Sequence, residues 1–197
     1  KLLEMGGDLK KSYQVRAKAV LKDGANMEDA AAWFEKAGDV RKAGDILVSL
    51  KEYGRALEMY ERCRHYPGLG DVHERRGDIE QAVICYLRGK RYDRARPLLR
   101  RQLAQGRMDR YYNVALDFEE SSQTASAAVI WDEIRSQDPS FRDVSSRLSR
   151  AEEKLGIGLE QILSARHAGE FRIVDRRHHQ QRTHQFLGQP MGLGRAQ

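Results

Sequence analysis

A thirteen-residue period is the feature that most constrains the fold of this chain. Alanine, and once leucine, recurs at that interval, and a large side chain follows four residues later in most copies. The anchors are Ala30, Ala43, Ala56, Leu69, Ala82 and Ala95, and the side chains that follow the first five are Phe34, Leu47, Tyr60, His73 and Tyr86. With Ala17 in the same frame, the period runs from about residue 17 to residue 94 without an insertion. A repeat of this kind governs the whole architecture and is considered before any local propensity.

The spacing inside one unit predicts a short α-helix. Counted from Tyr53, the recurring positions are Ala56, Met59, Tyr60 and Cys63. Steps of three and four residues place these side chains on one face of a helix. Thirteen residues therefore hold one helix of about ten residues and a short turn.

Glycine followed by aspartate marks some of the expected turns, at Gly38-Asp39 and Gly77-Asp78. Glycine suits the left-handed residue that often ends a helix, and aspartate suits the cap of the next helix. Isolated helices this short are marginal in water, so we expect them to stack on one another as an α-solenoid. The alternative is a non-repetitive helical bundle in which the spacing arises by chance.

A longer pattern follows at residues 108–141, and it resembles a tetratricopeptide repeat, a 34-residue helix–turn–helix unit. The residues at matching positions are Tyr111, Val114, Ala115, Phe118, Ala127, Trp131, Ile134 and Pro139. Ser122 and Thr124 replace the family's usual glycine and tyrosine, so the copy is degenerate. The thirteen-residue units, read as A-x-x-x-Y-x-x-A-G-D-Y-x-x, also look like compact tetratricopeptide-like arrays of multidomain bacterial proteins. The resemblance covers residues 17–155 and implies an all-α, right-handed solenoid of short antiparallel helices, whose hand comes from the resemblance alone.

Three regions are predicted along the chain. Residues 1–107 form the short-helix array, residues 108–155 the degenerate repeat with a capping helix, and residues 156–197 a basic, histidine-rich tail or linker that is largely disordered. The array opens with a helix over 8–22, whose apolar side carries Leu9, Tyr13, Val20 and Leu21. A closing helix is expected over 141–155, with Phe141, Val144, Leu148, Ala151 and Leu155 on its apolar face, and a short helix over 159–167.

Composition narrows the class of protein. Of the 197 residues, 40% are hydrophobic and 32% are charged, and no run approaches the roughly 20 apolar residues of a membrane helix. We therefore expect a soluble, cytoplasmic protein that does not engage a membrane. Two cysteines exclude a disulfide scaffold, and we expect Cys63 and Cys85 to be small buried hydrophobes.

Motifs that carry catalysis or bind cofactors do not occur in the sequence. It contains no phosphate-binding glycine loop and no metalloprotease, serine-hydrolase or kinase signature. His178, His179 and His184 lie near Asp175, but a floppy tail supplies no fixed geometry for a metal. We expect no enzymatic activity, no cofactor and no metal.

Charge segregation gives the best functional lead. Residues 88–110 contain nine basic residues and only two acidic ones, Asp93 and Asp109. Over residues 117–138 the acidic residues outnumber the basic ones, so the net charge of the stretch becomes negative. The bases are Arg88, Lys90, Arg91, Arg94, Arg96, Arg100, Arg101, Arg107 and Arg110. Arginine suits bidentate contact with carboxylates, so the candidate partner-binding residues are Arg91, Arg94, Arg100, Arg101 and Arg107. The alternative is that these side chains lie on solvated outer faces and pair with their neighbours.

These patterns predict a non-catalytic protein–protein interaction module, a scaffold or regulatory part of a larger bacterial protein. A peptide or protein partner, acidic where it meets the arginines, would lie in a groove of the solenoid. One rival is a nucleic-acid-binding helical repeat acting through residues 88–110, although this stretch lacks interleaved aromatic side chains for base stacking. Another is a structural spacer between signalling domains. The sequence leaves the identity of the partner and the oligomeric state open.

Overall fold

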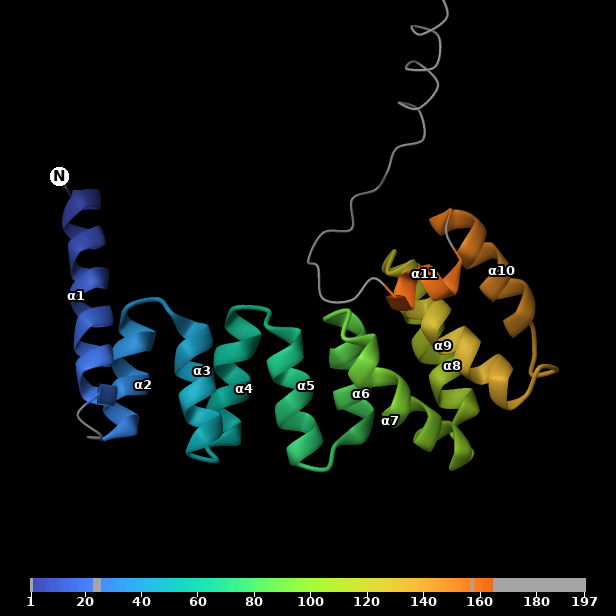
Figure 1. Cartoon of the computed structure of the whole chain (residues 1–197), viewed down its shortest axis with the longest axis horizontal. Helices are drawn as coiled ribbons and strands as arrows, with labels where there is room; N and C mark the ends of the chain where they lie inside the picture. The colour runs from blue at the N-terminus through green and yellow to red at the C-terminus, as the bar shows by residue number, and fades with distance from the viewer. Residues whose placement is uncertain (1, 23–25, 157, 165–197) are drawn as a thin grey trace, which may run out of the picture. The chain divides into compact units, whose positions relative to one another are not determined.

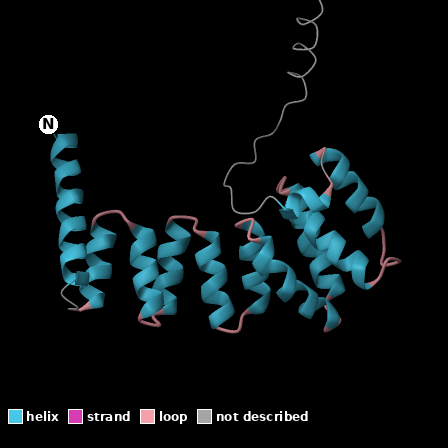
Figure 2. Cartoon of the chain, viewed as in Figure 1, coloured by secondary structure: helices cyan, strands magenta, loops and turns pink. Residues whose placement is uncertain are grey.

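The computed structural model describes residues 2–22, 26–156 and 158–164, which belong to one compact unit. These residues form helices joined by short turns, and no strand occurs among them (Figure 2). The predicted all-α class is confirmed. The expected tail over 169–197 lies outside the described residues.

Helix starts follow the predicted period. After α1 (Leu2–Lys22) come five helices of ten residues each, which begin at intervals of thirteen. They are α2 (Met27–Lys36), α3 (Val40–Ser49), α4 (Tyr53–Arg62), α5 (Tyr66–Arg75) and α6 (Ile79–Arg88). The predicted ten-residue helix is therefore confirmed for each of these units.

The helices then lengthen. Helix α7 (Tyr92–Ala104) has 13 residues, and α8 (Met108–Glu120) and α9 (Thr124–Gln137) form the helix–turn–helix expected over residues 108–141. The closing helix is α10 (Val144–Leu155), followed by α11 (Leu159–Ser164). The last residues of the short helix expected over 159–167 lie outside the described part of the chain.

Successive helices of the array pack side by side, and the chain reverses direction at each short turn (Figure 1). The turns α2–α3 and α4–α5 lie on one edge, whereas the turns α3–α4 and α5–α6 lie on the opposite edge, which we call the lower edge (Figure 1). Helix α7 departs from this order because it packs more extensively on α9 than on its immediate successor α8.

The repeat anchors form the centre of the packing. The alanine anchors of α2, α3, α4, α6 and α7 are each no more than 1% exposed, which brings neighbouring helices close together. The alanines concerned are Ala30, Ala43, Ala56, Ala82 and Ala95. The seven apolar residues that match the tetratricopeptide pattern in α8 and α9 are buried as well, with Trp131 the largest of them. Periodicity thus located the core correctly.

The array repeats in pairs of helices, a period of 26 residues that the anchor spacing conceals. The Tyr60 hydroxyl of α4 donates to Asp45 Oδ1 of α3 at 2.7 Å, and the Tyr86 hydroxyl of α6 donates to Asp71 Oδ1 of α5 at 2.6 Å. A Cβ added to Gly70 would lie 2.6 Å from the Tyr86 ring, and Gly44 stands in the same relation to Tyr60. A glycine–aspartate step in one helix therefore receives a tyrosine from the next helix.

Turns of the array share one backbone conformation. A residue of positive φ recurs every thirteen positions, at Gly38, Lys51, Arg64, Gly77 and Lys90. The next N–H donates to a carbonyl five residues back, as in Asp39 N to Phe34 O at 2.9 Å, which closes a Schellman turn. Glycine was therefore predicted correctly at 38 and 77, but Lys51, Arg64 and Lys90 adopt the same left-handed conformation with long side chains.

Aspartate caps only one of the two helices for which it was predicted. Asp78 Oδ1 accepts from Gln81 N at 3.3 Å, as expected. Asp39 makes no side-chain cap, because its carboxylate pairs with Lys42 in the first turn of α3. The capping prediction is therefore wrong for Asp39.

Two further predictions of buried side chains are wrong. Leu9 is 54% exposed, because α1 packs mainly on α2 and its N-terminal part extends well beyond it (Figure 1). Leu21, in the last turn of α1, is exposed as well. Only Tyr13 and Val20 of the predicted apolar side are partly covered, and Tyr13 stacks on Trp33 with ring centroids 5.6 Å apart. Cys63 is exposed rather than buried, because it follows the last residue of α4, where the chain turns away.

Candidate partner-binding surface

Helix α7 and the turns that flank it carry the five arginines proposed from the sequence. Arg91 caps α7 with its backbone, and its guanidinium binds Asp93 through two hydrogen bonds of 3.0 Å, Nε to Oδ1 and Nη2 to Oδ2. This hydrogen bonding lowers the pKa of the Asp93 carboxyl. Because the Arg91 guanidinium and the Asp93 carboxylate pair through two parallel hydrogen bonds, Arg91 has little free charge left for a partner.

Arg94 belongs to a network that joins α5, α6 and α7. Its Nη2 donates to Glu74 Oε2 at 2.8 Å and to the Tyr86 hydroxyl at 3.3 Å. That hydroxyl lies within donating distance of both Asp71 and Glu74. Burial and these two carboxylates raise the pKa of the Tyr86 phenol, and the hydrogen bond from Tyr86 lowers the pKa of Glu74. Arg94 therefore neutralises a carboxylate pair that packing has placed beside it.

Arg100 holds a buried carboxylate. The Glu133 side chain of α9 is 1% exposed and accepts from Arg100 Nε at 2.6 Å and Arg100 Nη2 at 3.1 Å. Arg96 also binds the Glu133 carboxylate and donates to Asp132 Oδ2 at 3.3 Å. The hydrogen bond to Glu133 raises the pKa of Arg100. This cluster ties α7 to α9 across 33 residues of sequence.

Arg101 and Arg107 differ from the other three. Both are exposed, and neither forms an ion pair with any residue that the structure describes. Arg110, nearby in α8, is held by Glu80 of α6 at 2.6 Å. The five candidates thus divide into three arginines occupied by the protein's own carboxylates and two that are free to meet a partner.

One exposed arginine outside this set stands on the lower edge. Arg76 follows the last residue of α5 and forms no ion pair among the described residues. The sequence offered a faint signal for it, since Arg75 and Arg76 shortly precede the basic stretch. Arg75 ends α5, and Arg76 lies in the turn that follows it.

The described residues give no support for a metal site, a membrane-spanning helix or a reactive cysteine. Within the described residues, no three His, Cys, Asp or Glu side chains gather as metal ligands would, and no helix is both long and apolar enough to cross a membrane. His178, His179 and His184 lie outside those residues. Cys85 is buried, and burial raises the pKa of its thiol to about 11, so at neutral pH it is a protonated packing residue.

Comparison with models of known protein families, with curated proteins and with solved structures found no match to this chain.

Proposed function

We propose that the chain is a tetratricopeptide-like, right-handed α-solenoid that serves as a non-catalytic protein-interaction module of a larger cytoplasmic bacterial protein. The carrying observation is the 26-residue helix pair, marked by the Tyr60–Asp45 and Tyr86–Asp71 hydrogen bonds. A stack of similar pairs presents successive helices at a fixed interval. Stacks of this kind suit extended partners that are read at several points.

Charge on the described surface supports a protein partner over a nucleic acid. Arg91, Arg94, Arg96, Arg100 and Arg110 each contact a carboxylate of the same chain. Binding to a phosphate backbone draws on many unneutralised cations along a continuous track. Dispersed free arginines among acidic side chains suit a partner with a few placed carboxylates instead.

The test is a pull-down from the source organism's lysate with the 197-residue chain as bait, with and without nuclease. The binding variant is R101E/R107E, because neither arginine has a structural partner. Variants at Arg94 or Arg100 are avoided, since a new carboxylate there would face Glu74 or Glu133. The control is R41E/R88E, which changes the same charge at two exposed arginines without ion pairs on α3 and α6.

A protein that survives nuclease and is lost only with R101E/R107E is the expected result. Recovery that disappears with nuclease would replace the proposal by the nucleic-acid-binding repeat. Recovery of no specific protein in any arm would leave the structural spacer as the better account.

A further inference from the structure

A histidine caps the helix that follows the α4–α5 turn. His65 precedes α5, and its Nδ1 accepts a hydrogen bond from the Gly68 N–H in the first turn of that helix at 3.1 Å. Asp39 and Arg91 stand one helix pair before and after His65, and neither makes a side-chain cap. An amide at the start of α5 therefore depends on an imidazole nitrogen, and the equivalent turns have no such bond.

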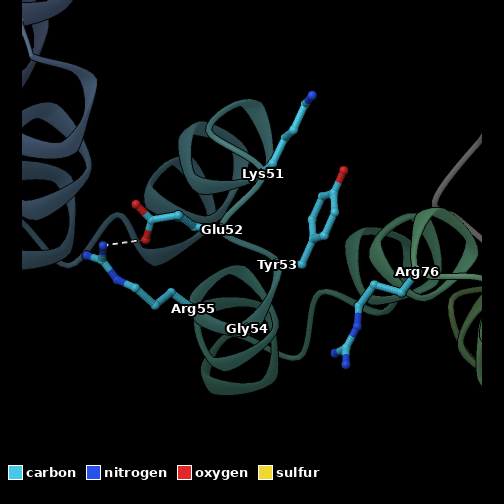
Figure 3. A pocket seen from close by; sticks show the side chains of 6 residues that line it. All are labelled: Lys51, Glu52, Tyr53, Gly54, Arg55 and Arg76. Carbon is cyan, nitrogen blue, oxygen red and sulfur yellow. Dashed lines mark hydrogen bonds and ion pairs between the residues drawn. The ribbon is translucent and has the colours of Figure 1, made fainter.

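The other residues that precede the helices from α2 to α6 do not share this chemistry. Asn26 caps α2 through its amide oxygen, and Asp78 caps α6 through its carboxylate. Glu52 makes no cap and binds Arg55 at 2.6 Å across the first turn of α4 (Figure 3). An amide does not titrate and a carboxylate is ionised throughout the neutral range, whereas an imidazole changes its charge there. The α4–α5 turn is thus the one in this series whose cap is a group that titrates near neutrality.

The capping bond requires a neutral imidazole. A backbone N–H can only donate, so Nδ1 of His65 accepts as an unprotonated nitrogen and the ring proton is on Nε2. A proton on Nδ1 would remove the acceptor of the Gly68 N–H. It would also place a positive charge at the N-terminal end of the α5 dipole, which is itself positive. Both effects oppose protonation of His65 while the turn is closed.

The charged groups around His65 come from α3, α4 and α5. The Tyr60 ring of α4 lies 5.2 Å from the imidazole, centroid to centroid, and its hydroxyl is bound to Asp45. Burial lowers the pKa of His65 below its ordinary 6.5, and Arg41 of α3 acts in the same direction. Asp45 of α3 and Asp71 of α5 act against this lowering of the pKa without reversing it.

The contact that this cap secures is a narrow one. Among successive helices from α1 to α7, α4 and α5 pack on one another least extensively. A Cβ added to Gly68 would lie 2.8 Å from the Tyr60 ring and 2.5 Å from His65 Nδ1, so the three residues fit closely. Arg64 in the same turn has a φ of 51°, a left-handed conformation that is unfavourable for a residue with a side chain. A strained residue, a narrow contact and a titratable cap therefore coincide at one turn.

We propose that the α4–α5 turn is an acid-sensitive joint of the array, held closed by the neutral His65 cap and opened locally when the imidazole is protonated. The cap stabilises the closed turn fully above pH 6.5, the ordinary pKa of histidine, and this stabilisation is lost as the pH falls below that value. Opening the turn lets α4 move relative to α5 while the contacts of the other helices persist. The inference concerns the fold itself and does not rest on the proposed interaction function.

Amide hydrogen exchange of the 197-residue chain, followed by NMR at about pH 7.5 and about pH 5, tests the proposal. The protection factor divides the intrinsic exchange rate by the observed rate, so it removes the ordinary effect of pH on exchange. The probes are the Gly68 N–H and the His65 N–H, which donates to Tyr60 O at 2.8 Å. Asp39 N and Arg91 N make the equivalent backbone bonds at the α2–α3 and α6–α7 turns, and they serve as internal controls.

Three variants separate the cap from other titrating groups. H65N keeps a good capping side chain that does not titrate, and H65A removes the cap at both pH values. H73Q is the matched control, because His73 is the other histidine within the described residues and also belongs to α5, with its Nδ1 3.4 Å from Asp78 Oδ2. Circular dichroism at each pH verifies that every variant remains helical.

The expected result is a loss of protection of at least about fivefold at the two α4–α5 amides on acidification, with the two control amides unchanged. H65N should stay protected at both pH values, H65A should be poorly protected at both, and H73Q should respond like the parent. Unchanged protection of the α4–α5 amides in the parent, or an equal loss at all three turns, would overturn the proposal. A response that persists in H65N or H65A, or that disappears in H73Q, would assign the titration to another group and refute a joint controlled by His65.

Discussion

Removing the two cations that hold Glu133 should destabilise the protein more than any other change on its surface. The variant R96M/R100M leaves a carboxylate with 1% exposure facing no arginine. Stripping the partners from a buried ion pair costs about 3–5 kcal/mol, because the remaining charge has lost both water and its counter-ion. We expect that full cost here, since Glu133 lies at the α7–α9 contact and cannot reach solvent without separating the two helices.

Single changes in the same cluster should cost less, in an order set by exposure. R100M leaves Arg96 in place, and because Arg100 is 56% exposed we expect a loss of about 1 kcal/mol. E133Q leaves Arg96 and Arg100, whose side chains are 25% and 56% exposed and can be hydrated, so about 1–2 kcal/mol is expected. Removing the buried charge is thus milder than removing the cations around it.

Urea unfolding followed by far-ultraviolet circular dichroism gives the free energies. R101M/R107M is the matched control and should stay within about 0.5 kcal/mol of the parent, because neither arginine has a partner. The triple variant R96M/R100M/E133L should recover most of the loss, because apolar side chains of similar volume replace buried ion pairs at little cost. A double variant no less stable than R101M/R107M would show that the Glu133 cluster contributes nothing to holding α7 on α9.

Further predictions concern the turns, the anchors and the acid response. Arg64→Gly should stabilise the chain by about 0.5–1 kcal/mol in urea unfolding, because it relieves the strain of an arginine in the left-handed conformation. Gly38→Ala at the equivalent turn should destabilise the chain. Stability changes of the same sign in the two variants would contradict the shared turn geometry. Ala82→Leu should cost about 1–3 kcal/mol by overpacking between α5, α6 and α7, and an unchanged melting midpoint would count against close helix stacking. The hydrogen bond from Tyr86 lowers the pKa of Glu74 below its ordinary 4.5, so this stabilisation is complete above pH 4.5 and lost as pH falls. Glu74→Gln should therefore flatten the acid limb of a stability–pH curve, and an unaltered slope would refute the linkage.

The sequence specified helices and core well because both depend on spacing alone. Alanine every thirteen residues located the helix contacts, and the longer pattern from Met108 located a second pair of helices. Periodicity cannot report the end of an apolar face, which depends on whether a neighbour covers it. Leu9 and Cys63 follow the pattern yet are exposed, because the first extends past α2 and the second lies beyond α4.

The candidate site was harder to predict because charge pairing is a long-range property. The residues next to Arg100 in the sequence do not predict its pairing with Glu133, which lies 33 residues away. The same is true of Arg94 and Glu74. A basic run in sequence therefore overstated the free positive charge of the folded surface. Arg76, which adjoins Arg75 just before the basic stretch, was not among the candidates, although it forms no ion pair among the described residues. Sequence density of arginine and availability of arginine are different quantities.

The 26-residue helix pair also behaves as a unit of length. Each helix from α2 to α6 contacts mainly its immediate neighbours, so a whole pair can be inserted or deleted without repacking distant parts of the chain. Duplication of residues 53–78 would add one more glycine–aspartate step for the next tyrosine. Gene duplication can therefore change the number of helix pairs, while the interval between them stays fixed by the width of a helix.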